Sequence, residues 1–156
     1  MKPLTVGIIG AGRIGKLHAE NLMTRVKGTK LKAVTDPFLD EKWAESKGIP
    51  VTGKDHRIML DDSEIDAVLI CSPSPQHAQQ IIECAQVGKH IFCEKPIALD
   101  PEVIRNSLSE VEKAEVKLQV GFNRRFDPSF ASVREKVSSG ALGDPQVIRV
   151  TSRDPA

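Results

Sequence analysis

Apolar residues follow two alternating patterns along the chain. Short runs rich in β-branched residues, several with no polar position, alternate with longer segments whose apolar residues recur at helical spacing. The first pattern is typical of strands buried on both faces of a sheet, and the second of helices with one buried face. We therefore predict strands over residues 5–10, 31–36, 49–52, 67–71, 90–93 and 118–121. We predict helices over residues 13–26, 40–47, 56–60, 76–87 and 128–138, with a further helix after residue 100.

Several residues mark where these helices begin, where they end and which side is apolar. Asp100 followed by Pro101 favours a helix start, and Gly88 is a natural stop for the helix before it. In helix 13–26 the larger apolar residues share one face: Ile14, Leu17, Leu22 and Val26. In helix 76–87 the apolar face carries Ala78, Ile81, Ile82 and Ala85.

The order of the elements predicts the fold class. Alternating strands and helices with right-handed crossovers give a parallel sheet that is covered by helices on both faces. We expect an α/β fold with a Rossmann-type, doubly wound, mainly parallel six-stranded sheet. This NAD-binding domain is expected over residues 1–125. Residues 126–156 are expected to be a linking helix and a first strand, 146–152, of a C-terminal α/β domain that the truncated chain otherwise lacks.

Composition and charge exclude several classes of protein. Hydrophobic residues make up 40% of the 156 residues and charged residues 28%, as in an ordinary globular domain. The net charge is +1 with both signs interspersed, so neither nucleic acid nor a membrane is an expected partner. No secretory signal stands at the N-terminus, so we expect a cytoplasmic protein whose three cysteines are reduced core residues. We expect no metal site.

A glycine-rich loop follows the first predicted strand. Gly10-Ala11-Gly12-Arg13-Ile14-Gly15 matches the G-x-G-x-x-G pattern between a strand and a helix, which is the context of a dinucleotide-binding loop. Gly10 permits the tight turn, Gly12 lets the backbone approach a pyrophosphate, and Gly15 lets the helix pack closely on the sheet. The start of the helix supplies free N–H groups for the phosphates. The alternative is a glycine-rich turn that binds no ligand.

An acidic residue lies where the adenosine ribose of a dinucleotide is expected. Asp36 ends the second predicted strand, about 20 residues after Gly15, where a carboxylate accepts the ribose hydroxyls of NAD. A 2′-phosphate would meet this like charge, and Pro37 and Phe38 offer no cation to offset it. We therefore predict NAD rather than NADP as the cofactor. Phe38 either flanks the adenine or packs in the core or a loop.

Three blocks of sequence carry a family resemblance. They are Val6–Gly15 with His18 one turn later, the segment from Cys71 to Pro96, and Gly121–Pro128. Together they resemble the N-terminal domain of the glucose–fructose oxidoreductase, inositol dehydrogenase and rhizopine-catabolism (Gfo/Idh/MocA) family. Glu94-Lys95-Pro96 is the most specific part, and the third block most resembles the inositol 2-dehydrogenase branch.

The resemblance implies a set of cofactor-binding residues. They are Gly10, Gly12, Arg13, Ile14, Asp36, Ser72, Pro73, His77, Glu94, Lys95 and Asn123. The first four would hold the pyrophosphate, Asp36 the ribose, and the last three the nicotinamide end, where Arg124 is a second candidate. The carboxyl ends of the strands line the ligand crevice of an open α/β sheet, and several of these residues are predicted at such ends.

Lys95 is the implied catalytic residue. In such enzymes the lysine hydrogen-bonds the reacting hydroxyl, and an ammonium there stabilises negative charge on the oxygen as hydride leaves carbon. The alternative for Lys95 is a solvated surface lysine. His77 either contacts the cofactor or caps and packs its helix, and His18 is expected to be structural.

The resemblance implies an NAD-dependent oxidoreductase that oxidises a secondary hydroxyl of a cyclic polyol or sugar. The first expectation is conversion of myo-inositol to 2-keto-inositol. In the family a second domain supplies a histidine as general base, and here no histidine follows His90. We therefore expect this chain to be the cofactor-binding part and inactive alone. The alternative is a non-enzymatic NAD-binding or redox-sensing module. The predicted strand 146–152, with no partner strand, favours self-association.

Overall fold

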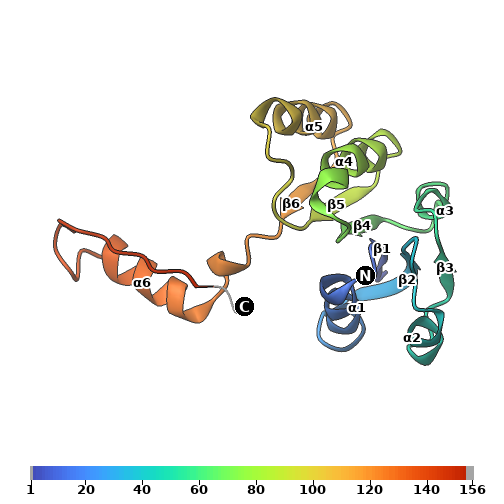
Figure 1. Ribbon diagram of the computed structural model, residues 1–156, viewed down its shortest axis with the longest axis horizontal. Coiled ribbons are helices and arrows are strands. Elements are labelled where there is room, and N and C mark those ends of the chain that lie inside the picture. Colours follow the sequence, from blue (N-terminus) through green and yellow to red (C-terminus); the bar gives the residue numbers. More distant parts are fainter. Residues whose placement is uncertain (1, 154–156) are drawn as a thin grey trace. The chain divides into compact units, whose positions relative to one another are not determined.

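The chain forms two units. The computed structural model describes residues 2–153, and contacts divide the chain into Met1–Gly121 and Phe122–Ala156. Figure 1 shows the first unit, from blue at β1 to orange at β6, as a sheet with helices, and the second, from orange at α6 to red, as a helix followed by an irregular segment. The assignment of residues 126–156 to a second domain stays a prediction.

Six parallel strands form the sheet of the first unit, in the order β3–β2–β1–β4–β5–β6. They are β1 (Leu4–Ile9), β2 (Thr29–Thr35), β3 (Val51–Gly53), β4 (Ala67–Ile70), β5 (His90–Cys93) and β6 (Leu118–Val120). The strand order reverses between β1 and β4, which pair in parallel with Ile9 opposite Ile70. Ligands of such sheets bind beyond the carboxyl ends of the strands at this reversal. The predicted α/β fold with a parallel six-stranded sheet is confirmed.

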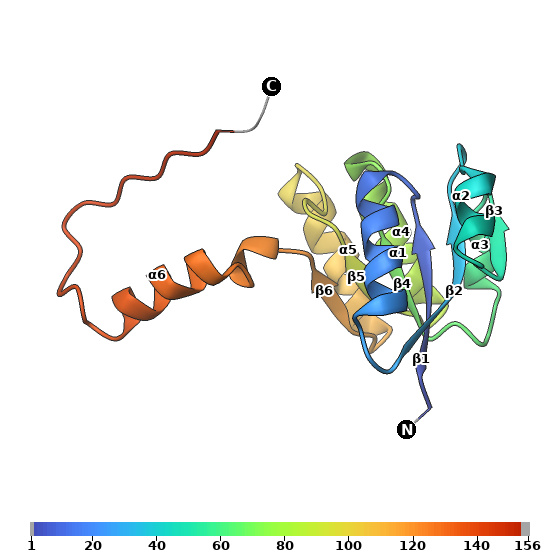
Figure 2. The same ribbon diagram turned by 90° about the horizontal axis from the view of Figure 1, so that it is seen from below.

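Helices cover both faces of this sheet. They are α1 (Arg13–Thr24), α2 (Glu41–Ser46), α3 (Arg57–Leu60), α4 (His77–Gln86) and α5 (Pro101–Lys113), with a 3-10 turn, η1 (Ser74–Gln76), before α4. Figure 1 shows α4 and α5 on one side of the sheet and α1 and α2 on the other, and Figure 2 shows α1 running alongside β1. The predicted cap of α5 is confirmed, because the Asp100 side chain accepts a hydrogen bond from the Glu102 N–H at 2.8 Å.

Two apolar clusters fill the space between the sheet and its helices. One joins β1, β4 and β5 to α4 and α5 and includes Ile81, whose side chain is fully buried. The other joins β1 and β2 to α1 and α2 and includes Ala19 and Ala44. The predicted apolar face of α4 is confirmed for Ala78, Ile81 and Ala85, which are buried, whereas Ile82 is half-buried.

Helix α1 packs on the sheet through small residues. Gly15 and Ala19 are its buried residues, whereas Ile14 and Leu17 are 37% and 52% exposed. A side chain at Gly15 would overlap the carbonyl oxygen of Gly10. Because α1 approaches β1 this closely, only small residues fit between them. The face predicted from the larger apolar residues is therefore wrong for Ile14, Leu17 and Val26, whereas Leu22 is half-buried and packs against the core.

The second unit contains a 3-10 turn, η2 (Asn123–Arg125), and one helix, α6 (Pro128–Ser138). Asp127 caps α6 by accepting hydrogen bonds from the N–H groups of Ser129 and Phe130. The strand predicted at 146–152 is not formed, because that segment pairs with no strand of the described chain. Neither α6 nor any other helix among the described residues is long and apolar enough to cross a membrane.

Candidate cofactor-binding site

A cavity of about 450 Å³ opens at the carboxyl ends of β1, β2 and β4. Its lining comes from the glycine loop after β1, the segments that follow β2 and β3, the loop after β4 and the beginning of α4. Seven predicted cofactor contacts lie in this lining: Gly10, Gly12, Arg13, Ile14, Asp36, Ser72 and Pro73. The structure thus brings together residues from three loops that are distant in sequence.

The turn after β1 requires glycine at its first position. Gly10 has a φ of +93°, a backbone conformation that other residues rarely adopt. A Cβ there would also lie 2.6 Å from the backbone of Cys71 and Ser72. The turn therefore passes directly against the loop that follows β4, and this contact fixes the position of the whole glycine loop.

The beginning of α1 has backbone amides without internal partners. Gly12 is the N-cap residue, no side chain caps the helix, and no acidic residue lies in the first turn. A Cβ at Gly12 would meet nothing within 4 Å, so this glycine faces open space. Free N–H groups and the positive end of the helix dipole are the usual features of a phosphate site. The geometry fits a pyrophosphate lying over Gly12 and Arg13.

Asp36, which follows β2, braces the glycine loop. Its carboxylate accepts a hydrogen bond from the Ala11 N–H at 2.7 Å and another from the Phe38 N–H at 2.8 Å. Each carboxylate oxygen has a second lone pair, and the side chain lines the cavity, so Asp36 can still accept hydrogen bonds from ribose hydroxyls. Asp36 therefore shapes the loop as well as supplying negative charge.

Two neighbours of Asp36 also fit a bound dinucleotide. Phe38 lines the cavity and is 94% exposed, so it is not a core residue and its ring is free to lie against a planar group. Thr35 lines the same cavity and is 1% exposed, and its hydroxyl has no hydrogen-bond partner in the described part of the chain. A ligand or an ordered water would satisfy such a buried hydroxyl.

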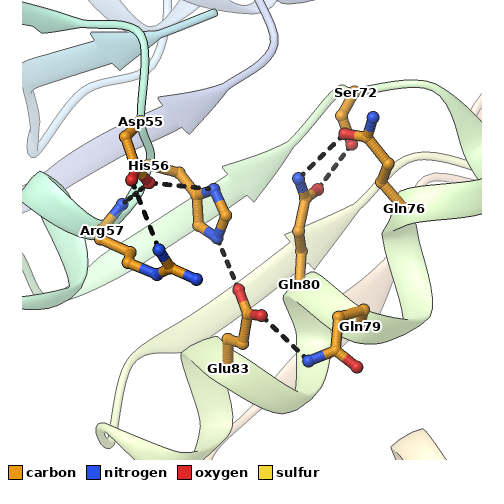
Figure 3. Close-up of polar contacts among 8 residues, drawn as sticks. All are labelled: Asp55, His56, Arg57, Ser72, Gln76, Gln79, Gln80 and Glu83. Carbon is orange, nitrogen blue, oxygen red and sulfur yellow. Dashed lines mark hydrogen bonds and ion pairs between the residues drawn. The ribbon is translucent and has the colours of Figure 1, made fainter. Parts of the chain in front are cut away.

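Lys54 and His56, which follow β3, line the same cavity and were not selected from the sequence. Lys54 brings a cation to a region where the sequence indicated only the charge of Asp36. His56 Nε2 lies 2.6 Å from Glu83 Oε2, and Gln79 donates a hydrogen bond to Glu83 Oε1 at 2.9 Å (Figure 3). Burial raises the pKa of Glu83, but the hydrogen bonds from Gln79 and His56 outweigh it and lower the pKa overall. The strand order places β3 beside β2, so the segment that follows β3 reaches the cavity. The sequence alone did not indicate this neighbourhood.

The loop after β4 is held by side chains of α4 and of the turn before it. The Ser72 hydroxyl donates to Gln80 Oε1 at 2.6 Å, and Gln80 Nε2 donates to Gln76 Oε1 at 3.3 Å (Figure 3). Gln80 is 5% exposed, and both glutamines line the cavity. Ser72 therefore reaches the cavity from a loop whose position α4 determines.

Glu94 and Lys95 follow β5, the next strand along the sheet. Glu94 Oε1 lies 2.9 Å from Nε2 of His18 on α1, and Glu94 Oε2 accepts a hydrogen bond from the Lys95 N–H at 3.3 Å. His18 thus has the structural role that was expected for it. The Lys95 side chain is exposed, and the Lys95–Pro96 peptide bond is cis. Glu94 links α1 to the loop that carries Lys95.

His77 opens α4 but does not line the cavity. Its side chain is 1% exposed, and both ring nitrogens lie within hydrogen-bond distance of backbone carbonyl oxygens. The ring therefore has no surface to offer a cofactor in this structure. Packing, the alternative to a direct contact, describes its position better.

Asn123 belongs to the second unit, in η2. Its backbone carbonyl accepts a hydrogen bond from the Phe126 N–H at 3.0 Å. The guanidinium of Arg124 lies 5.0 Å from the centre of the Phe130 ring. The contact of Asn123 with the nicotinamide end of a cofactor stays a prediction.

The cysteines are free thiols, as expected. Cys84 and Cys93 are buried and Cys71 is half-buried. Burial raises the pKa of each of the three thiols to about 12, so they stay protonated at neutral pH. Among residues 2–153 no cluster of histidine, cysteine, aspartate and glutamate side chains is arranged to hold a metal ion.

The tight turn, the uncapped helix and the acid after β2 together define a dinucleotide-binding α/β domain. The chain belongs to the Gfo/Idh/MocA oxidoreductase family, because the model of that family, described as an oxidoreductase family with an NAD-binding Rossmann fold, matches residues 4–122. The predicted cofactor, NAD, is confirmed by this match.

Inositol dehydrogenases are among the similar proteins. The chain is 42% identical to the myo-inositol 2-dehydrogenase of Thermotoga maritima, over 98% of this chain and 46% of that protein. It is 44% identical to the inositol 2-dehydrogenase of Rhizobium meliloti, over 96% and 45%. It also resembles the crystal structure of scyllo-inositol dehydrogenase from Lactobacillus casei with bound NAD(H) and scyllo-inositol, with a TM-score of 0.86, 39% identity, and coverage of 92% and 43%. The chain spans less than half the length of these relatives.

Proposed function

We propose that this chain is the NAD-binding part of a dehydrogenase that oxidises a secondary hydroxyl of a cyclic polyol, with myo-inositol to 2-keto-inositol as the reaction. The observation that carries the proposal is the position of Lys95. It lies after β5, one strand along from the loop of Ser72 and on the same edge of the sheet as the cavity. A non-enzymatic NAD-binding module needs the glycine loop and Asp36 but has no need of an exposed lysine there.

NAD supplies the hydride acceptor when it is bound. The residues of this chain bind and orient it: the amides after Gly12 hold the pyrophosphate and Asp36 holds the ribose. The Lys95 ammonium donates a hydrogen bond to the reacting hydroxyl oxygen and stabilises the negative charge that develops there. By resemblance to the family, the proton of that hydroxyl goes to a histidine of a second domain.

Cofactor titration tests the binding half of this proposal. Calorimetric titration of wild-type chain is expected to show NAD binding and much weaker NADP binding. Asp36→Ala should weaken NAD binding by about 10- to 100-fold, since hydrogen bonds to a charged group contribute about 1.5–3 kcal/mol. Asp61→Asn, an exposed acid outside the cavity, is the matched control and should bind NAD as the wild type does.

Asp36→Asn separates the two roles of Asp36, which are to brace the glycine loop and to supply negative charge. The amide keeps one oxygen to accept from a backbone N–H, so the loop is partly braced while the negative charge is lost. NAD binding should fall, and discrimination against NADP should fall with it. Equal NAD affinity in the wild type, Asp36→Ala and Asp36→Asn would contradict the assigned ribose contact. Absence of any cofactor binding by a folded wild-type chain would contradict the proposal itself.

A chimaera tests the catalytic half. We expect the 156-residue chain alone to form almost no NADH from myo-inositol, because the family's histidine base belongs to a second domain and no histidine follows His90 here. Joined to the remaining residues of the Thermotoga maritima relative, the chain should oxidise myo-inositol. Lys95→Met in that chimaera should lower kcat by about 100- to 1,000-fold, as loss of one donor to a developing oxyanion does. A kcat unchanged by Lys95→Met would contradict the role of Lys95, whereas a chimaera that binds NAD but forms no NADH would favour the binding-module alternative.

We also propose that residues 146–152 promote self-association of this chain. Val147, Ile148 and Val150 are 86%, 79% and 79% exposed, and the backbone of this segment has no partner strand within residues 2–153. Such a segment tends to pair with another copy. Analytical ultracentrifugation should show dimers at high concentration, and Ile148→Lys should abolish them. Leu142→Lys, in the same unit and 62% exposed, is the control. A wild-type monomer at every concentration would contradict this proposal.

A further inference from the structure

The hydrogen-bonding surroundings of the His77 ring differ from those of His18 and His56. The ring is buried, Nδ1 lies 2.8 Å from the Pro96 carbonyl oxygen, and Nε2 lies 2.7 Å from the Ser72 carbonyl oxygen. Both partners are acceptors, and neither can donate a proton. His18 and His56, in contrast, each place one ring nitrogen against a carboxylate, on Glu94 and Glu83.

The two carbonyl groups belong to the loops that carry the cofactor and lysine sites. Ser72 lies in the loop after β4, where its hydroxyl is held by Gln80. Pro96 directly follows Lys95, and the Lys95 N–H donates a hydrogen bond to the Glu94 carboxylate. The last ladder hydrogen bond between these strand ends runs from the Glu94 N–H to the Ile70 carbonyl. Beyond that point, the His77 ring directly links the two loops through its two polar contacts.

We propose that His77 is a positioning residue: a doubly protonated imidazolium whose two N–H groups clamp the Ser72 and Pro96 carbonyls and so fix Lys95 relative to the cofactor cavity. A neutral imidazole has one N–H and one lone pair. With both nitrogens 2.7–2.8 Å from carbonyl oxygens, a neutral ring would point its lone pair at an oxygen. The cation donates to both, and hydrogen bonds from a charged donor are the stronger kind.

The geometry of the clamp also explains why histidine is needed. The two donors of an imidazolium lie on opposite sides of a rigid ring and so reach acceptors on two different loops. A glutamine or asparagine carries both of its N–H groups on one nitrogen and cannot span the same gap. The link to cofactor binding rests on the proposed function, whereas the protonation state of the ring does not.

The ring nitrogens report the proposal directly. The chain has four histidines, and ¹⁵N-labelled histidine with His18→Gln, His56→Gln and His90→Gln variants assigns the His77 ring by elimination. In long-range ¹H–¹⁵N spectra at about pH 7.5, where an exposed histidine is mostly neutral, both His77 nitrogens should have protonated-type shifts. One protonated and one lone-pair-type nitrogen would overturn the proposal, whether or not the chain binds NAD.

Cofactor titration then tests the consequence for the site. His77→Gln should weaken NAD binding by about 10-fold with the circular dichroism spectrum retained, since one carbonyl loses its donor. His90→Gln, a half-buried histidine of β5 outside the cavity, is the matched control and should bind NAD as the wild type does. Unchanged NAD affinity in a folded His77→Gln variant would overturn the positioning role. If His77→Gln does not fold, the wild-type ¹⁵N spectrum still decides the proposal.

Discussion

Two neighbouring regions at the carboxyl ends of the strands are held in position by different means. The first lines the cavity, whereas the second lines it through the loop after β4 but not through residues 94–96. The phosphate wall, Gly10–Gly15 with Asp36, is positioned by backbone: a glycine turn, free amides and a carboxylate bonded to two N–H groups. The lysine wall, the loops 71–76 and 94–96, is positioned by side chains that reach it from helices. His77 and Gln80 come from α4, and His18 comes from α1.

This difference decides which substitutions each wall tolerates. The phosphate wall has no room for an added Cβ at Gly10 or Gly15, but it depends on few side chains. The lysine wall depends on particular side-chain donors and acceptors, so it should respond to substitutions that change the hydrogen-bonding group. The following substitutions test the comparison at each wall.

The largest effect is expected from Gly15→Ala in the phosphate wall. The new Cβ would overlap the Gly10 carbonyl oxygen, which is backbone and cannot rotate away. Helix α1 must then move off β1, and we expect a loss of at least about 3 kcal/mol of unfolding free energy, near the upper end for overpacking. Urea unfolding followed by circular dichroism measures it. NAD binding should be lost with the packing.

Gly12→Ala is the matched control for that experiment. Its Cβ would meet nothing within 4 Å, so stability should change by less than about 1 kcal/mol. The same Cβ projects where the pyrophosphate is expected, so NAD binding should fall while the fold is kept. If Gly12→Ala and Gly15→Ala destabilised the chain equally, the close approach of α1 to β1 would not be what Gly15 provides.

A smaller effect is expected where α1 meets the lysine wall. The His18 ring lies 2.9 Å from Glu94 Oε1 and packs edge-on against Phe92 with ring centres 5.3 Å apart. His18→Ala should lower the unfolding free energy by about 1–2 kcal/mol, because the pair is largely shielded from solvent. A double-mutant cycle with Glu94→Gln should give a coupling energy of about 1 kcal/mol.

The exposed pair of Lys16 and Asp40 serves as the comparison for that cycle. Its atoms are 2.9 Å apart, but its side chains are 33% and 52% exposed. Lys16→Ala should therefore cost about 0.5 kcal/mol or less, since exposed ion pairs contribute little. Equal losses in His18→Ala and Lys16→Ala would mean that the His18–Glu94 contact does not hold the lysine wall.

The comparison of the walls also explains which parts of the site the sequence predicted. The phosphate wall depends on the glycines of the loop and on an acidic residue about 20 positions after them. Both features can be recognised within one stretch of sequence. Gly10, Gly12 and Asp36 were selected from it and lie together in the structure. The alternation of strands and helices predicted the parallel six-stranded sheet as well, although it did not give the order of the strands.

The remaining residues depend on contacts between elements that are distant in sequence. The partners of His77 are 5 and 19 positions away, and Glu94 is 76 positions from His18. No spacing rule connects such pairs, because they meet only when neighbouring strands of the sheet end at the same edge. Lys54 and His56 were missed for the same reason. The buried face of α1 was missed because close packing selects small residues, which a search for large apolar residues passes over.

The smallest effect is expected away from both walls, in the loop that precedes β4. The hydrogen bond from Lys32 lowers the pKa of Asp62 below its ordinary value of 3.8, and the same contact raises the pKa of Lys32 above 10.5. A lowered carboxyl pKa contributes stability that is complete above about pH 4 and is lost as pH falls through the folded-state value. A raised lysine pKa contributes stability that is present below about pH 10.5 and is lost as pH rises further.

Lys32→Met should therefore flatten the acid side of the stability curve. Urea unfolding between about pH 2 and pH 7 should show a shallower loss of stability toward low pH than in the wild type, because Asp62 then titrates near its ordinary value. NAD affinity at neutral pH should be unchanged, since Lys32 and Asp62 do not line the cavity. A weakened NAD affinity in this variant would mean that the strand edge opposite the cavity influences the site, and that the two walls are not positioned by local contacts alone.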